Sequence, residues 1–285
     1  MKKLAFILIL ALLVGLLPGC ANTPQAQIAA TTLPVYEFTV RLCEGTGISV
    51  TRLITEEVSC LHDYTLKTTQ MRAIEQAQHV VISGGGLEDF MTDILPKDKT
   101  IDASAGLELH CGHEHEGHSH ENDPHIWLSP LHAKDMVSNI ANSLRTQFPE
   151  HSNNFTINEQ ILRRELDALY RFGVEQLAGL SSRQLVTFHD GFNYFAECFD
   201  LEILHAVEEE AGSEASAQEL IYLAKLVQEH DLPAIFTERS GSTSAAQIIA
   251  AETDVQIYTL DMAMSGDSYY DAMHANIKVI KEALG

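Results

Sequence analysis

The segment 79-HVVISGGGLEDFMTDILPKDKTIDA-103 carries a short apolar run, three consecutive glycines, a second apolar stretch and another short apolar run. It predicts a strand over 79–83, a tight turn at 84–86, a helix over 87–95 that Pro96 stops, and a strand over 100–103. Strands that alternate with helices favour a parallel sheet. The glycine triplet fits neither G-x-G-x-x-G nor a Walker pattern, so we interpret it as a strand-to-helix turn.

The same alternation covers most of the chain. Further strands are predicted over 27–31, 48–54, 184–188, 202–206, 234–237 and 256–260, and further helices over 35–43, 69–78, 192–199, 215–230, 244–252 and 269–284. No strand pattern occurs between Pro130 and Leu180: one helix is expected over 131–148, followed by a connecting helix over 150–180 that would be about 40 Å long. We therefore expect an α/β protein with two parallel-sheet lobes, 27–149 and 181–285, joined by a long rigid helix.

The first twenty residues, MKKLAFILILALLVGLLPGC, have the pattern of an export signal. Two lysines precede an apolar run that is shorter than the ~20 residues a membrane span needs. The run ends in Leu-Pro-Gly-Cys20, which resembles a bacterial lipobox; an ordinary signal peptide is the alternative. Both interpretations place the mature protein outside the cytoplasm, and the first anchors it by lipid on Cys20 at the outer face of the cell membrane.

The composition excludes several classes of protein. A hydrophobic fraction of 45% and a charged fraction of 20% are typical of a globular chain, not of a disordered, collagen-like or multi-span membrane protein. The formal net charge is −22, which repels phosphate backbones and attracts cations. We expect no nucleic-acid partner.

Four side chains have the chemistry and the position for a metal site. His62, His125, His189 and Asp261 lie where strands of the two lobes end or in the loops that follow, and ligands of open α/β sheets bind beyond the carboxyl ends of the strands. Three imidazoles and one carboxylate suit tetrahedral zinc. Each residue alone is weak support, since a lone histidine is more often a surface or hydrogen-bonded residue. The hypothesis depends on all four meeting.

The chain resembles the metal-specific solute-binding lipoproteins of bacterial ABC importers, the zinc- and manganese-uptake receptors. The resemblance rests on Asp123-Pro-His-Ile-Trp-Leu128, His62-Asp-Tyr64, His189-Asp190, Leu260-Asp261 and Gly85-Gly-Leu-Glu88, and covers nearly all of the mature chain. It departs from the family at 65–69, where a Glu-Pro-Thr-Pro-like run is usual, and at Ser129, where aspartate is usual. It implies two lobes, a connecting helix, metal in the cleft, and delivery to ABC permease subunits by a non-enzymatic monomer.

The third ligand position helps to choose the metal. Manganese-specific relatives tend to carry glutamate there, whereas this chain has His189. Imidazole suits Zn²⁺, and Mn²⁺ prefers oxygen donors. We expect Zn²⁺ as the carried ligand, with Mn²⁺ as the alternative. Asp63, Asp190 and Glu238 could orient the imidazoles or be plain surface acids, and Glu238 could also be a spare ligand.

A histidine-rich loop over 110–122 is the second candidate metal-binding feature. His110, His113, His115, His118 and His120 fall within eleven residues, a composition typical of metal-binding tracts; a solvated charged loop is the alternative. The loop resembles the histidine-rich insertion of zinc-uptake receptors, and we expect it to collect zinc weakly beside the cleft.

Other classes of protein remain open from the sequence. A zinc hydrolase would need an open coordination position and a general base, and no H-E-x-x-H occurs; an adhesin or structural lipoprotein would make the histidines incidental. The remaining cysteines, Cys43, Cys60, Cys111 and Cys198, are too few and too scattered for a disulfide framework. A single Cys43–Cys60 bridge is compatible with the spacing, but the pairing cannot be deduced.

Overall fold

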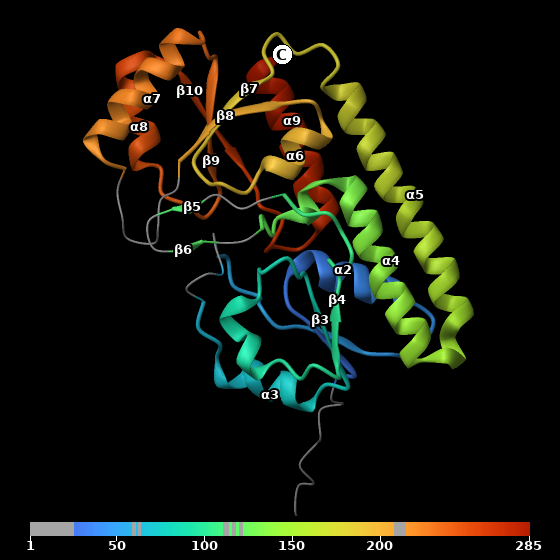
Figure 1. The fold of residues 1–285 in the computed structure, drawn as a ribbon. Helices are drawn as coiled ribbons and strands as arrows, with labels where there is room; N and C mark the ends of the chain where they lie inside the picture. The colour runs from blue at the N-terminus through green and yellow to red at the C-terminus, as the bar shows by residue number, and fades with distance from the viewer. Residues whose placement is uncertain are drawn as a thin grey trace, which may run out of the picture.

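The structure is a computed structural model that describes residues 26–58, 61, 64–110, 122–207 and 215–285, and the backbone of 114–115 and 118–119. Two four-stranded parallel sheets form two lobes (Figure 1). The first contains β1 (Ile28–Ala30), β2 (Val50–Arg52), β3 (His79–Ile82) and β4 (Thr100–Asp102); the second contains β7 (Gln184–Thr187), β8 (Glu202–Ala206), β9 (Ala234–Glu238) and β10 (Gln256–Leu260). The predicted α/β fold class is confirmed.

Both sheets have the same topology. Their spatial orders are β2-β1-β3-β4 and β8-β7-β9-β10, so in each lobe the first strand lies between the second and the third. The connection from the first strand to the second therefore runs toward one edge of the sheet, and the connection from the third strand to the fourth runs toward the other edge. Ligands of such sheets bind at this switch point, beyond the carboxyl ends of the two central strands. The switch points lie after β1 and β3 in the first lobe, and after β7 and β9 in the second.

Helices cover the sheets because strand side chains alternate between faces. In the second lobe, Val186 and Ile235 join the buried cluster formed with α7 (Ala217–Glu229) and α8 (Ser244–Thr253). Their neighbours Leu185 and Phe236 belong to the larger cluster, which includes side chains of α6 (Asn193–Cys198) and α9 (Tyr269–Leu284). In the first lobe, α2 (Leu33–Leu42) and α3 (Thr68–Gln76) follow β1 and β2.

A long helix connects the lobes. After α4 (Pro130–Gln147) and a 3-10 turn over Pro149–His151, α5 runs over Ser152–Gln176, which corresponds to about 37 Å. Glu165 of α5 forms an ion pair with Arg41 of α2 (2.7 Å), and Gln176 of α5 accepts a hydrogen bond from Lys281 of α9 (2.7 Å). Figure 1 shows α5 running along one side of both lobes. The predicted helix over 150–180 is confirmed, shorter by a few residues at each end.

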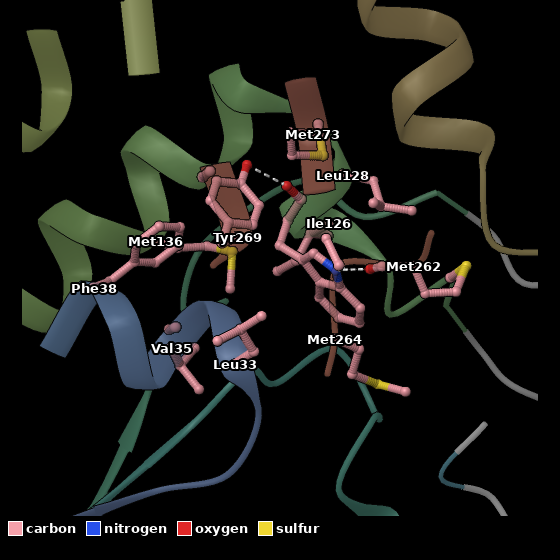
Figure 2. Close-up of a cluster of buried hydrophobic side chains, with 14 of the residues drawn as sticks. Leu33, Val35, Phe38, Ile126, Leu128, Met136, Met262, Met264, Tyr269 and Met273 are labelled. Atoms are coloured by element: carbon pink, nitrogen blue, oxygen red, sulfur yellow. Dashed lines mark hydrogen bonds between the residues drawn. The ribbon is translucent and has the colours of Figure 1, made fainter. Parts of the chain in front are cut away.

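The lobes also share one hydrophobic core. Residues 262–269, which follow the last strand, pack on the first lobe beside α2 and the segment before α4 (Figure 2). The Trp127 indole donates to the carbonyl of Met262 (2.7 Å), and the Tyr269 hydroxyl donates to the carbonyl of Trp127 (2.7 Å). Both rings are fully buried. This packing restricts how far one lobe can move relative to the other.

Two local predictions differ from the structure. The helix expected over 87–95 is a 3-10 helix over Asp89–Ile94, because Glu88 turns inward and binds the backbone of the preceding turn instead of starting an α-helix. A short antiparallel hairpin of β5 (Glu114–His115) and β6 (His118–Ser119), which the sequence did not predict, lies in the histidine-rich loop. Among the described residues, no helix is long and apolar enough to cross a membrane.

Candidate metal centre

His125 is held by the segment that leads into α4. The next three residues, Ile126–Leu128, form a fully buried 3-10 turn, and the His125 side chain is itself nearly inaccessible. Its Nδ1 lies 2.8 Å from Oδ1 of Asp123, and its backbone N–H donates to the same oxygen at 3.0 Å. A carboxylate only accepts hydrogen bonds, so Nδ1 carries a proton, and Nε2 is the nitrogen that the neutral ring can offer to a metal ion.

Asp123 remains ionised in this buried position. Burial alone would raise its pKa, but hydrogen bonds from His125 and from Asn193, together with the charge of His125, outweigh burial and lower the pKa below its ordinary value. The sequence motif contained Asp123, but sequence reasoning assigned it no role. An aspartate two residues before a candidate ligand, in a turn closed by proline, is the signal that could have identified it.

His189 follows β7, at the switch point of the second sheet. Oε2 of Glu238, the last residue of β9, lies 3.7 Å from Nδ1 of His189. Glu238 is therefore on the side of the ring away from Nε2, which favours an orienting role over that of a spare ligand. Gly191 makes room for this ring, because a Cβ at Gly191 would lie 3.0 Å from Nε2 of His189 and 2.6 Å from Cε of Met262.

The two histidines face each other across the lobes. Their Nε2 atoms are 3.5 Å apart, and their ring planes are inclined by 82°. In a tetrahedral zinc site with bonds of about 2.0–2.1 Å, two nitrogens are about 3.3–3.4 Å apart. The separation is therefore close to what one zinc ion bound by both rings requires.

Asp261 is engaged in other contacts. Its Oδ2 accepts a hydrogen bond from Nη1 of Arg239 at 2.7 Å, and its Oδ1 accepts one from the backbone of Ala263 at 2.8 Å. Within the described part of the chain, no group of three or more His, Cys, Asp or Glu side chains is arranged to hold a metal ion. His62 and Asp63 lie outside the described residues, so the four-ligand site stays a prediction of which the structure brings together His125 and His189.

The base of the histidine-rich loop contacts the second lobe. Nε2 of His110 lies 2.7 Å from Oε2 of Glu197, and its ring stacks on Tyr194 with centroids 4.2 Å apart. Both partners belong to α6. His113 and His120 lie outside the described residues; His115 and His118 are paired through the backbone of the hairpin, and their side chains are not described.

Two of the five cysteines lie in the part of the chain that the structure describes. Cys43 is a free, buried thiol, and Cys198 is free as well. Burial raises the pKa of Cys43 to about 12, which makes it unreactive at neutral pH. Cys20, Cys60 and Cys111, like the whole of the export signal predicted over 1–20, lie outside the described residues.

Comparison with known proteins places these features in a family. The model of the family described as "Zinc-uptake complex component A periplasmic" matches residues 28–283. The chain is 30% identical over 309 aligned positions to the zinc-binding lipoprotein AdcA of Streptococcus pneumoniae (serotype 4), which covers 99% of this chain but 61% of that protein. A putative metal-binding protein of Treponema pallidum (strain Nichols) is 28% identical and is covered over 97% of its length.

A solved structure agrees with the fold. The crystal structure of the Zn(II)-bound ZnuA-like domain of Streptococcus pneumoniae AdcA superposes with a TM-score of 0.75 at 28% identity, over 90% of this chain and 98% of that one. The chain thus spans less than two thirds of the full-length pneumococcal protein, and it covers almost all of its ZnuA-like domain.

Proposed function

Because this chain belongs to the family of the periplasmic component A of zinc-uptake complexes, we propose that it is an extracytoplasmic receptor that binds Zn²⁺ and delivers it to an ABC-type permease. The observation that carries the proposal is the pair of Nε2 atoms, 3.5 Å apart, contributed by different lobes. Nitrogen donors favour zinc over manganese.

The proposed ligands are His62, His125, His189 and Asp261. Asp123 orients His125 by its hydrogen bond to Nδ1, and Glu238 lies at the corresponding nitrogen of His189. Asp190 accepts a hydrogen bond from Asn193, and Asp63 is proposed only from its place next to His62. The transported ion would bridge the lobes and stabilise the ordered cleft by mass action.

The histidine-rich loop is proposed as an accessory zinc collector. The contact of His110 with Glu197 and Tyr194 keeps the start of this loop at the second lobe, close to Asp123, whose backbone N–H donates to the His110 carbonyl at 3.0 Å. In this role the loop supplies the cleft without belonging to the tight site. Anchoring by lipid on Cys20 and a monomeric state complete the proposal.

Equilibrium dialysis followed by metal analysis tests the proposal. The mature chain should retain one tightly bound zinc ion in competition with excess manganese, and deletion of residues 110–121 should leave that ion in place. Retention of manganese instead would support the manganese-receptor alternative. The absence of any tight metal would contradict the receptor function and support an adhesin, and zinc-dependent turnover of an ester or peptide would support a hydrolase.

A further inference from the structure

Asn193 lies between two carboxylates that come from different lobes. It is the first residue of α6, and its side-chain Nδ2 lies 3.1 Å from Oδ2 of Asp123 and 2.9 Å from Oδ1 of Asp190. An amide nitrogen has two N–H groups, so one side chain can serve both acceptors. No role for Asn193 was evident from the sequence.

Both carboxylates are adjacent to the facing histidines. Each carboxylate oxygen of Asp123 has its own partner. Oδ1 accepts a hydrogen bond from Nδ1 of His125, and Oδ2 accepts one from Nδ2 of Asn193. Asp190 directly follows His189 in the chain. The next residue of α6 adds a second contact, since the Tyr194 hydroxyl donates to the backbone carbonyl of Asp123 at 3.1 Å. The first turn of α6 thus binds Asp123, which orients His125, through two hydrogen bonds.

The chemistry of an amide suits this position. Two carboxylates close together repel each other unless donors lie between them, and a neutral amide supplies two donors without adding charge. Asp123 is 5% exposed, so water cannot readily replace a lost donor at Oδ2. An orienting carboxylate that loses its own partner would hold its imidazole less firmly.

We propose that Asn193 is a positioning residue of the metal centre, which fixes Asp123 from the opposite lobe so that His125 keeps its proton on Nδ1 and presents Nε2 to His189. This inference rests on the proposed function and deepens it. Asn193 contacts no metal itself; it acts through Asp123, and through Asp190 it ties this arrangement to the second lobe.

Two readouts test Asn193→Ala, with Asn153→Ala as the control because Asn153 is an exposed asparagine in the first turn of α5. Long-range ¹H–¹⁵N NMR of the metal-free protein should show His125, identified by the loss of its signals in His125→Gln, change from a single Nδ1–H tautomer to a mixture. Zinc affinity, measured by chelator competition, should fall about 10–100-fold, the range typical of outer-shell partners. The control should change neither.

Asn193→Gln retains the amide and should recover part of both properties; it also replaces the alanine variant if that variant does not fold. An unchanged tautomer and an unchanged zinc affinity in folded Asn193→Ala would overturn the inference. The tautomer is measured without metal, so it tests the role of Asn193 even if the wild-type chain binds no zinc tightly. A wild-type chain that binds no zinc tightly would instead contradict the proposed function.

Discussion

The Nε2 atoms of His125 and His189 lie 3.5 Å apart, although the two residues are separated by 64 positions in the chain and belong to different lobes. Each ring has a carboxylate on its opposite side, at Nδ1. With each Nδ1 beside a carboxylate, both Nε2 atoms face the space between the lobes, at a separation close to that of two nitrogens bound to one zinc ion. The geometry therefore favours binding of one ion by both rings.

Replacing either histidine should remove tight zinc binding. His125→Ala and His189→Ala should each weaken zinc affinity by more than about 100-fold, beyond the loss typical of outer-shell partners. Trp127, the only tryptophan of the chain, has its ring centroid 5.5 Å from that of His125, so its fluorescence can follow the zinc titration. His230→Ala, at an exposed position after α7, is the matched control. Wild-type zinc affinity in His125→Ala or in His189→Ala would show that the replaced histidine is not a zinc ligand.

Zinc should cause only a small movement between the lobes. The connecting helix α5 contacts both lobes, and the buried bond from Trp127 to Met262 ties residues after the last strand to the first lobe. A wide hinge motion would have to open this shared core. Spin labels carried by p-acetylphenylalanine at Glu75 and Gln247, exposed positions on α3 and α8, should report nearly the same distance with and without zinc. A shift of many ångströms would contradict the braced arrangement.

The sequence predicts the order of the elements well because the signal is local. Alternating apolar runs and helical periodicity predict the central elements of both sheets, and β8, β10 and α9 begin and end where the pattern indicates. The helix predicted over 87–95 is a shorter 3-10 helix, because Glu88 turns inward and accepts hydrogen bonds both from its own turn and from a distant residue. Thr31, 57 positions away from Glu88, donates to its buried carboxyl group, and no local pattern reports such a partner.

The site is predicted less completely than the fold. Histidines after strand ends are visible as motifs, and His125 and His189 do meet. The residues that orient them carry no recognisable sequence signal. The roles of Asp123 and Asn193 follow from their hydrogen bond, which forms only because the folded lobes place α6 against the segment before α4. The contact of Asp261 with Arg239 was missed because it joins the ends of β9 and β10, two strands that only the folded sheet brings side by side.

The buried carboxyl group of Glu88 should make stability depend on pH. Burial raises the pKa of Glu88 to about 7, although Thr31 and two backbone N–H groups partly oppose the rise. Between its ordinary pKa of 4.5 and about 7, the folded protein binds more protons than the unfolded chain. The free energy of unfolding should therefore fall as pH rises through this window, by on the order of 3 kcal/mol, and level off above it.

Urea unfolding of the metal-free protein between pH 4.5 and 8 measures this dependence. Glu88→Gln cannot ionise, so its unfolding free energy should vary less with pH than that of the wild type across the same window. Glu108→Gln, an exposed substitution in the same lobe, should follow the wild-type curve. Equal slopes for Glu88→Gln and the wild type would show that Glu88 is not protonated in the folded protein at the lower pH values.

Asp261 can act as a zinc ligand only if the ion competes with Arg239. The arginine side chain is 61% exposed, and exposed ion pairs contribute about 0.2–1 kcal/mol. If Asp261 binds zinc, Arg239→Ala should therefore raise zinc affinity by up to about fivefold. Arg171→Ala removes the same charge from an exposed position on α5 and controls for the general effect of a more negative protein.

A double-mutant cycle separates this competition from other effects of the substitution. Asp261→Ala should weaken zinc binding strongly, and adding Arg239→Ala in that background should then change the affinity no more than Arg171→Ala does, because the carboxylate for which zinc and Arg239 compete is gone. The measurement is chelator competition on all four proteins of the cycle. If Asp261→Ala leaves the zinc affinity at the wild-type value, Asp261 serves only to bind Arg239 and the backbone of Ala263, and the fourth ligand must come from elsewhere in the cleft.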